Sequence, residues 1–573
     1  MKKTLKFIKD PLYLTMSITP FLLGGFFEFT SCIISAVLLV LILKHELKIS
    51  LDLGAMAAVS IPLFYLLSVL WAVDKGMAII GFMKFLPLPL FVLLIIREPE
   101  KRDKCLDAIP WAGTVMTVIS FPLSFFSWAE GHFTVSGRLA GFFEYPNTFA
   151  LFLLLGLIIL ATSSKLGVCH LILGAVLLFG IFQSGSRTVF VLLILAAVII
   201  AIFGTNKRVK KITLIAVPAS VAAAVLVALL TGNFQAAGRF LTSSFTQSSF
   251  LGRLLYYYDA LPVIAKNPFG LGYEGYFYTQ GVFQTGVYTV RYIHNDFLQI
   301  LLDIGWMPFL LLVIAVVKAF FKKGASLRKR ILLIAVCGHC MLDFSLQYIS
   351  IFFILLLLLD YEKIREVSKA GIKKLIYASG ALLSAICVYF TAASFAQYLG
   401  KYEISVGIYP FYTDGYVALM TKETDIEVAK LYSDKVIELN TNVHQAYLIQ
   451  SLYDFSKGSM LSAIENREKA ISLSPYTLSS YTEYMEMLEV GITLYEQAED
   501  NGSAEFCRKK LISIPERFDK VIEKTSTLGW LINDLPPELP EEYRSIAEGY
   551  KNKLKLTRKN VENKILWRIS NES

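Results

Sequence analysis

Charged residues are scarce in this chain, and those present are unevenly distributed. Only 18% of its 573 residues are Asp, Glu, Lys or Arg, whereas soluble domains average about 25%. Residues 1–396 are apolar runs separated by short polar loops, while residues 400–573 have the mixed composition of a soluble domain. The composition therefore predicts a polytopic membrane protein followed by a domain outside the lipid.

Several absences narrow the chemistry. No cluster of His, Cys, Asp or Glu has the spacing of metal ligands, and there is no Walker motif. Gly270 and Gly272 lack the strand–helix context of a nucleotide loop. Cys337 and Cys340 have the spacing of a disulfide oxidoreductase, but they lie within an apolar helix and are expected to pack there. We therefore predict no metal, no other cofactor and no direct ATP hydrolysis.

The net charge of +9 is compatible with nucleic-acid binding. The positive residues lie between hydrophobic runs, however, where membrane topology explains them better. No nucleic-acid partner is therefore expected. No small-residue cleavage site follows the first apolar run, and many more apolar runs come after it, so no cleavable signal peptide is predicted.

A membrane-spanning helix needs about 20 mostly apolar residues. On this basis the fold class is all-α, a bundle of about thirteen spans within residues 1–398, followed by a helical domain at residues 399–573. Some of the predicted spans are short. They lie at residues 11–28, 30–44, 54–72, 78–96, 105–127, 147–163, 167–183, 187–204, 211–231, 296–320, 331–344, 346–360 and 373–396.

Lys and Arg in alternate loops set the predicted orientation. One set of loops is rich in them: Lys2, Lys3, Lys6, Lys9, Lys44, Lys48, Arg97, Lys101, Arg102, Lys104, Lys165, Lys207, Arg208, Lys210, Lys211, Lys322, Lys323, Arg328, Lys329, Arg330, Lys363, Arg365, Lys369, Lys373 and Lys374. The opposite set carries Lys75, Arg138, Arg187, Arg239, Arg253, Lys266 and Arg291. The N-terminus is therefore predicted to be cytoplasmic, and thirteen spans place the C-terminal domain outside. The long loop 232–295 then lies on the outer side, where loops on a rigid bundle often carry function.

The C-terminal domain contains a repeat. Residues 429–447 and 463–481 share Ala, Lys, Ile, Leu and Tyr at matching positions, with an offset of 34 residues. This is the period of tetratricopeptide repeats, which stack pairs of helices. Such domains usually bind a protein partner. The alternative is a spacer that packs on the membrane domain.

Polar groups gather in segments predicted to lie on the outer side. These segments are 137–141 with Arg138, the Pro146-Asn147 pair, 184–187 with Arg187, Arg253, the stretch 267–273, and His294-Asn295-Asp296. Arg187 begins a span, beside backbone N–H groups that attract anions, and Arg binds phosphate bidentately. His294 lies at the membrane boundary and has an unperturbed pKa near 6.5, which suits a general base. The alternative for each is a hydrogen-bonded residue at the membrane interface.

Two further groups lie within predicted spans. His339 and Asp343 are spaced i, i+4 and are a candidate intramembrane polar pair. Lys84 lies in the fourth span, where it is expected to neutralise either a buried acid or a ligand phosphate.

In this order, these outer segments resemble the O-antigen ligase and polymerase family of bacterial surface-glycan enzymes. The resemblance covers roughly residues 130–360, and its most specific part is His294-Asn295 followed by Gly305. Pro308 departs from the Gly, Thr or Tyr usual at that place and is expected to reshape the helix. The segments 253–256 and 267–272 and the pair Ser186-Arg187 also resemble the family.

The resemblance implies a GT-C-like fold in the bacterial cytoplasmic membrane and a metal-independent, inverting glycosyltransferase. The donor would be a glycan on an undecaprenyl diphosphate, and the acceptor a glycan or lipid-linked hydroxyl on the outer face. Arg187 and Arg253 would bind the diphosphate, with Arg138 and Asn295 as further substrate contacts, and His294 would deprotonate the acceptor. The extra span and the outer repeat domain favour a polymerase of cell-wall or capsular polysaccharide over a lipopolysaccharide ligase.

Two other classes of function remain open. A transporter of a small solute or ion would show internal repeats and broken helices near the bilayer midplane. A membrane-anchored scaffold would use the repeat domain to recruit a partner. The long outer loop, rich in Arg, Gly and Tyr, argues against a simple anchor.

Overall fold

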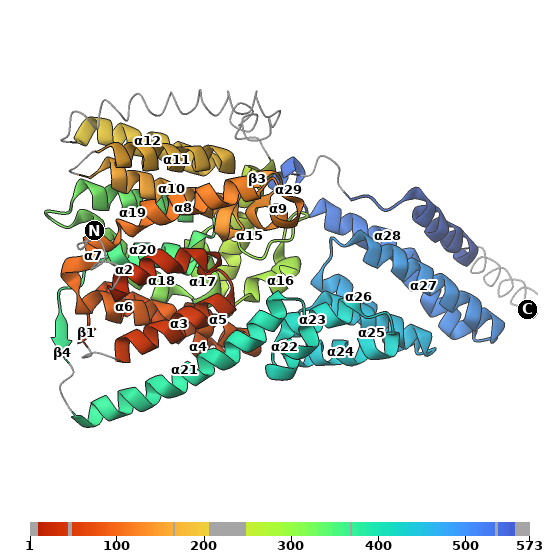
Figure 1. Cartoon of the computed structure of the whole chain (residues 1–573). Coiled ribbons are helices and arrows are strands. Elements are labelled where there is room, and N and C mark those ends of the chain that lie inside the picture. The colour runs from red at the N-terminus through yellow and green to blue at the C-terminus, as the bar shows by residue number, and fades with distance from the viewer. Residues whose placement is uncertain are drawn as a thin grey trace, which may run out of the picture. The chain divides into compact units, whose positions relative to one another are not determined.

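Helices make up most of the chain (Figure 1). The computed structural model describes residues 10–43, 48–163, 167–204, 248–366, 370–532 and 537–555. The chain divides into two compact units. The first, here called the bundle unit, comprises residues 1–245, 260–276 and 291–412. The second, the C-terminal unit, comprises residues 246–259, 277–290 and 413–573.

The described helices of the bundle unit follow the predicted apolar runs. They are α2 (Pro11–Ile18), α3 (Glu28–Leu43), α4 (Leu53–Ser68), α5 (Lys75–Phe85), α6 (Pro87–Arg97), α7 (Arg102–Cys105), α8 (Ala108–Leu123), α9 (Ser127–Phe133), α10 (Pro146–Ala161), α11 (Val168–Ser184), α12 (Arg187–Phe203), α17 (Asp296–Ile304), α18 (Trp306–Phe321), α19 (Leu327–Cys340), α20 (Ile349–Leu358), α21 (Ala370–Tyr398) and α22 (Tyr402–Ile408). Short 3₁₀ turns lie at Thr19–Phe21, Leu23–Gly25, Pro99–Lys101, Gly141–Phe143 and Ser345–Gln347.

Many of these helices are apolar enough for a membrane. Among the described residues, Lys75–Arg97, Pro99–Leu123 and Tyr377–Tyr398 have the length and composition to cross one, and seven shorter apolar helices accompany them. The predicted span 211–231 lies outside the described residues. The total of thirteen spans, and with it the orientation, stays a prediction.

Close approach of small residues packs the bundle. Association inside lipid depends on van der Waals contact rather than on the hydrophobic effect, so small residues let helices approach. A Cβ added to Gly113 of α8 or Gly180 of α11 would lie 2.9 or 2.5 Å from the Leu153 side chain of α10. Leu153 itself is fully buried. Helices α8, α10 and α11 therefore pack closely against one another (Figure 1).

The predicted spans 11–28 and 296–320 are not continuous helices. In the first, α2 ends at Ile18 and two 3₁₀ turns follow. Residues 296–320 form two helices, α17 and α18, which are broken at Gly305. Gly305 has φ +78°, and a Cβ there would lie 2.2 Å from the carbonyl oxygen of Pro268. The backbone of the preceding outer segment therefore occupies the break. Pro308 lies in the first turn of α18, where proline is tolerated, so the break comes before it.

Two small strand pairs, which the sequence analysis did not predict, interrupt the all-α pattern. Strand β1 (Lys48–Ser50) pairs antiparallel with β4 (Ile364–Glu366), and β2 (Thr134–Val135) pairs with β3 (Arg138–Leu139). The second pair forms a short hairpin that presents Arg138.

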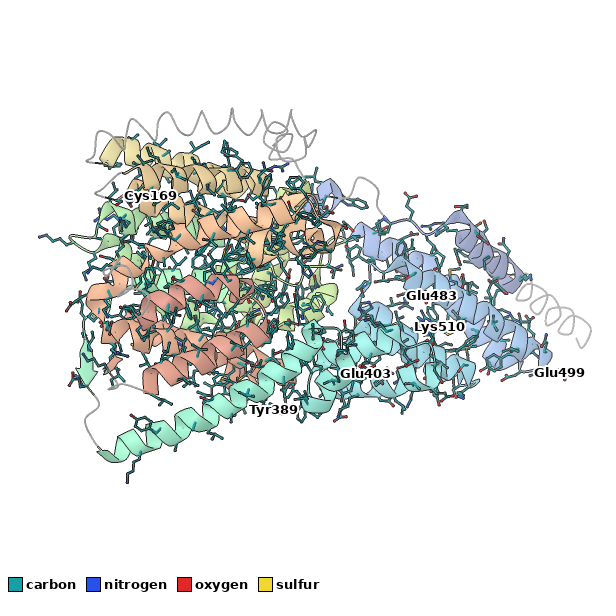
Figure 2. All side chains as sticks on the ribbon, viewed as in Figure 1. Cys169, Tyr389, Glu403, Glu483, Glu499 and Lys510 are labelled. Carbon is teal, nitrogen blue, oxygen red and sulfur yellow. The ribbon has the colours of Figure 1, made fainter. Side chains whose placement is uncertain are left out.

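The C-terminal unit is helical. Its helices are α23 (Thr413–Lys422), α24 (Ile426–Leu439), α25 (His444–Ser456), α26 (Met460–Leu473), α27 (Leu478–Gln497), α28 (Asn501–Glu523) and α29 (Thr527–Ile532), with a further helix at 541–555. Helices α26 and α27 begin 34 residues after α24 and α25, respectively. The helical pairs thus repeat at the predicted offset, while their assignment to the tetratricopeptide class stays a prediction. Glu483 and Lys510, on α27 and α28, are labelled in Figure 2.

Part of the long outer loop belongs to this second unit. Helices α15 (Ser248–Lys266) and α16 (Gly275–Phe283) are each divided between the units, and residues 246–259 and 277–290 group with residues 413–573. Asp259 and Ser526 both contact Thr285: the Thr285 hydroxyl donates to Asp259 at 2.7 Å, and the Ser526 backbone N–H donates to the Thr285 carbonyl at 2.8 Å. The predicted boundary at residues 398–399 stays a prediction, because the grouping does not follow chain order.

Candidate functional site

His294 lies immediately before helix α17, at the end of the long loop 232–295. Asn295 is the N-cap of α17, and its side-chain oxygen accepts hydrogen bonds from the backbone N–H groups of Phe297 and Leu298, each at 3.1 Å. Asn is among the best N-cap residues because it satisfies the unpaired donors of a first helical turn. His294 has φ +56°, an uncommon backbone conformation for a residue other than glycine. The helix start therefore fixes the position of the imidazole, and Asn295, predicted as a substrate contact, has a structural role.

The partner of His294 is Asp343, which follows helix α19. Nδ1 of His294 lies 3.3 Å from a carboxylate oxygen of Asp343. The Asp343 side chain is fully buried, whereas that of His294 is 23% exposed. This arrangement leaves the histidine accessible on one side and held by a buried carboxylate on the other.

Two residues from the start of α10 complete the surroundings of Asp343. The Asn147 amide donates to Asp343 at 2.8 Å, and the Tyr145 hydroxyl donates at 2.9 Å. The predicted intramembrane pair of Asp343 with His339 missed these partners; Nδ1 of His339 lies 2.8 Å from the Ser345 hydroxyl. A buried carboxylate is tolerated only with such donors. The sequence analysis named Asp343 only as a partner of His339; its contact with His294 makes it a candidate for the functional site.

Arg138 extends this set of contacts toward α12. Its Nη2 donates to the side-chain oxygen of Asn147 at 2.6 Å, and its Nε donates to the carbonyl oxygen of Ser184 at 2.7 Å. Ser184 ends α11, three residues before Arg187. We call His294, Asp343, Asn147, Arg138 and Ser184 the outer network, after the side of the membrane that the sequence predicts for it. Arg138, predicted as a ligand contact, is a link within it.

Arg187 is the first residue of α12 and is partly exposed. The positive end of the helix macrodipole disfavours a cation at this place and favours an anion. The N-cap residue, Ser186, makes no side-chain capping hydrogen bond, so the first turn of α12 has backbone N–H groups without that partner. A guanidinium together with such N–H groups suits a phosphate.

Arg253 lies on α15, in the C-terminal unit. One turn and a half later on this helix, Asp259 accepts hydrogen bonds from the backbone and side chain of Thr285 and, at 3.0 Å, from the Tyr288 hydroxyl. Burial raises the pKa of Asp259 above its ordinary value, and these hydrogen bonds partly oppose the shift. These contacts fix the helix that carries Arg253. Its predicted convergence with Arg187 and His294 on one cavity stays a prediction.

A buried cation lies close to the outer network. Lys84 is fully buried, and its Nζ lies 3.7 Å from a carboxylate oxygen of Glu28 and 3.1 Å from the Tyr273 hydroxyl. Of the two predicted roles for Lys84, neutralising a buried acid is the one that these contacts match. The Tyr292 ring lies between this cluster and Phe344, which in turn packs edge-on against His294 at 5.1 Å. Aromatic rings thus form the wall beside the histidine.

The glycine-containing stretch 267–272 closes the break between α17 and α18. The backbone N–H groups of Leu271 and Gly272 donate to the carbonyl oxygens of Leu302 and Asp303 at 2.6 and 2.9 Å. Gly270 has φ +81°, and a Cβ there would lie 2.4 Å from the Asp303 backbone. The glycines therefore serve close backbone packing, and the carbonyls at the end of α17 receive protein donors.

No group of three or more His, Cys, Asp or Glu side chains within the described ranges could hold a metal ion. The arrangement can instead provide a base, His294, oriented by a carboxylate, and an anion site at the start of α12. A hydroxyl bound beside His294 would have a proton acceptor, and a phosphate at α12 would have donors.

Part of the chain matches a known protein family model. Residues 172–313 match the family model described as O-Antigen ligase. This stretch contains Arg187, Arg253, His294 and Asn295, whereas Arg138 and Asp343 lie outside it. No curated protein and no solved structure matches the chain.

Proposed function

We propose that this chain, whose residues 172–313 carry an O-antigen ligase family domain, is a glycosyltransferase that transfers a glycan from an undecaprenyl-diphosphate donor. The family implies a membrane polysaccharide ligase or polymerase. The acceptor is a hydroxyl of a glycan at the outer face of the bacterial cytoplasmic membrane. We favour a polymerase of cell-wall or capsular polysaccharide, because the helical C-terminal unit is an addition to the ligase pattern. That unit would lie outside the membrane.

The observation that carries the proposal is the contact between His294 and Asp343. An ionised carboxylate can only accept a hydrogen bond, so Nδ1 of His294 is the donor and Nε2 has the lone pair. Nε2 removes the proton of the acceptor hydroxyl as its oxygen attacks the anomeric carbon. The bond from that carbon to the diphosphate oxygen breaks, and the configuration inverts. Asp343 stabilises the imidazolium that forms.

Negative charge develops on the diphosphate as it leaves, and positive groups must stabilise it. Arg187, the first residue of α12, would supply this charge, and the backbone N–H groups of the first turn would add donors. The assignment of Arg253 to the same diphosphate rests on its sequence segment. Two guanidinium groups would neutralise the leaving group without a metal ion.

The transporter alternative predicted broken helices, and α17 and α18 are such a pair. In transporters the exposed carbonyls of a broken helix coordinate the transported ion. Here the carbonyl oxygens of Leu302 and Asp303 accept hydrogen bonds from residues 271 and 272. The break is therefore filled by protein, which favours the transferase.

Removing the gene and analysing both surface glycan and lipid-linked intermediates tests the proposal. Single repeat units accumulating on the lipid would identify a polymerase. Complete chains accumulating on the lipid would identify a ligase and correct our choice between the two. Unchanged lipid-linked material and unchanged surface glycan would contradict transfer from the lipid carrier.

A further inference from the structure

A second polar region lies at the opposite end of the bundle unit. Helix α10 begins with Asn147 of the outer network in its first turn and ends at Ala161, and α12 runs from Arg187 to Phe203. At 1.5 Å per residue, helices of 16 or 17 residues span about 25 Å. Their far ends border a cavity of about 880 Å³. This cavity is therefore separate from the outer network.

The cavity is lined by more cations than anions. Arg102, Lys322, Lys323, Arg328 and Lys329 line it, together with the carboxylates of Asp103 and Asp360. Lys322 and Lys329 share a single oxygen of Asp360, at 3.2 and 2.8 Å. Lys323 is exposed. Lys322 also donates to Glu362, and Arg328 lies 3.8 Å from Asp107, so these five cations have four carboxylates beside them and one positive charge remains in excess.

Part of this charge has a structural purpose. Nη2 of Arg102 donates to the carbonyl oxygens of Leu357, at 2.9 Å, and Leu359, at the end of α20. Nε of Arg328 donates to the Thr162 hydroxyl at 3.0 Å, at the end of α10. Positive side chains commonly occupy helix C-termini. Lys322 and Lys329 instead donate to carboxylates, Lys322 to Asp360 and Glu362 and Lys329 to Asp360.

The pKa of Lys329 shows the effect of the neighbouring charges. Burial lowers the pKa of Lys329 below its ordinary value, Asp360 opposes this shift, and Arg102 and Lys322 add to the lowering by repulsion. A bound anion would relieve that repulsion. The cavity wall is also apolar on one side, with Leu106, Ile200, Phe203, Leu357 and Leu358 beside the cations. Cations next to apolar helix ends match the boundary between a lipid headgroup and its acyl chains.

We propose that this cavity binds the phosphate headgroup of an anionic phospholipid, with Lys322, Lys323 and Lys329 as its ligands. The predicted orientation puts it on the cytoplasmic side, where such lipids attract basic segments. The site is independent of the transferase reaction. Its occupant would fix the ends of α10, α12 and α20 together.

Native mass spectrometry of the detergent-purified full chain tests this proposal. The probes are phosphatidylglycerol, phosphatidylcholine and inorganic phosphate, each added alone and in competition. We expect one phosphatidylglycerol to be retained, and phosphatidylcholine to be retained far less. The double variant Lys322→Gln/Lys323→Gln should bind phosphatidylglycerol roughly tenfold more weakly. The matched control is Lys363→Gln/Arg365→Gln, which removes two exposed cations that do not line the cavity.

A second variant leaves the charge in place. Ala325 lines the cavity, so Ala325→Trp should fill it and displace the lipid while retaining every lysine. Retention of phosphatidylglycerol at the wild-type level by both variants would overturn the proposal. Equal retention of phosphatidylcholine, or displacement of the lipid by millimolar phosphate, would also overturn it. These readouts measure lipid retention and are unaffected if the transferase proposal fails.

Discussion

Two carboxylates, one from each unit of this protein, are stabilised in different ways. In the bundle unit, Asp343 is fully buried and receives donors from Asn147 and Tyr145, almost 200 residues earlier, and contacts His294. In the C-terminal unit, Glu468 is 29% exposed and pairs with Lys510 of a helix in the same repeat stack. Water can replace a partner of Glu468 but not one of Asp343. Substitutions in the outer network should therefore have the larger effects.

The largest expected effect follows from removing the base. His294→Ala should lower the rate of glycan transfer by about 10²–10⁴ and leave donor binding largely intact, because general-base catalysis contributes about that factor. The measurement is transfer by purified protein from a lipid-diphosphate oligosaccharide. His132→Ala is the matched control, because His132 is 69% exposed on α9. Near-normal turnover of His294→Ala would mean that another group is the base.

A smaller loss is expected from changing the orienting carboxylate. Asp343→Asn keeps the shape of the side chain but removes the charge that fixes the imidazole tautomer, so we expect about 10²-fold lower kcat with little change in KM. Tyr145→Phe removes one hydrogen bond to the same carboxylate and should cost less. A loss of kcat/KM that is fully accounted for by a loss of folded protein in the Asp343→Asn variant would point to a purely structural role.

Asp343 also shows where sequence reasoning stops. Apolar periodicity located the helices, and the 34-residue offset located the helical pairs, because both signals are local. The His294–Asp343 contact joins residues 49 positions apart and depends on how α17 and α19 pack. The spacing of i, i+4 paired Asp343 with His339 instead of with His294. The break at Gly305 was missed for a similar reason, since its cause is the docking of residues 268–272.

Changing the anion-binding candidate should act on donor binding. Arg187→Ala should raise KM for the lipid-diphosphate donor roughly tenfold or more, which is the loss of a charge-assisted hydrogen bond. Arg187→Lys should recover only part of this, because Lys lacks the bidentate fork. Arg239→Ala is a sequence-matched control: it removes an Arg that is also predicted on the outer side. An Arg187→Lys variant with wild-type KM would exclude bidentate phosphate binding.

The smallest expected effect concerns Glu468 in the C-terminal unit, the partly exposed carboxylate that was compared with Asp343. Glu468 accepts hydrogen bonds from Lys510 at 2.9 Å and from Arg517 and Tyr484, each at 3.1 Å. Burial opposes its ionisation, but Lys510, Arg517 and the Tyr484 hydrogen bond together hold the pKa of Glu468 below its ordinary value of 4.5. A carboxylate with a lowered pKa stabilises the fold above the unfolded pKa, and that contribution disappears as the pH falls through the folded pKa. The protection of α26 and α28 against hydrogen exchange in the full chain, corrected for the pH dependence of intrinsic exchange, should therefore fall on acidification below about pH 4.5. Glu468→Gln should reduce this pH dependence and cost at most about 1 kcal/mol at neutral pH, because the pair is partly exposed.

Glu516→Gln, which removes an exposed partner of Lys520 on the same helix, should leave the exchange of α26 unchanged. A loss of several kcal/mol in Glu468→Gln would show that water does not replace its partners, and the contrast between the two units would then fail.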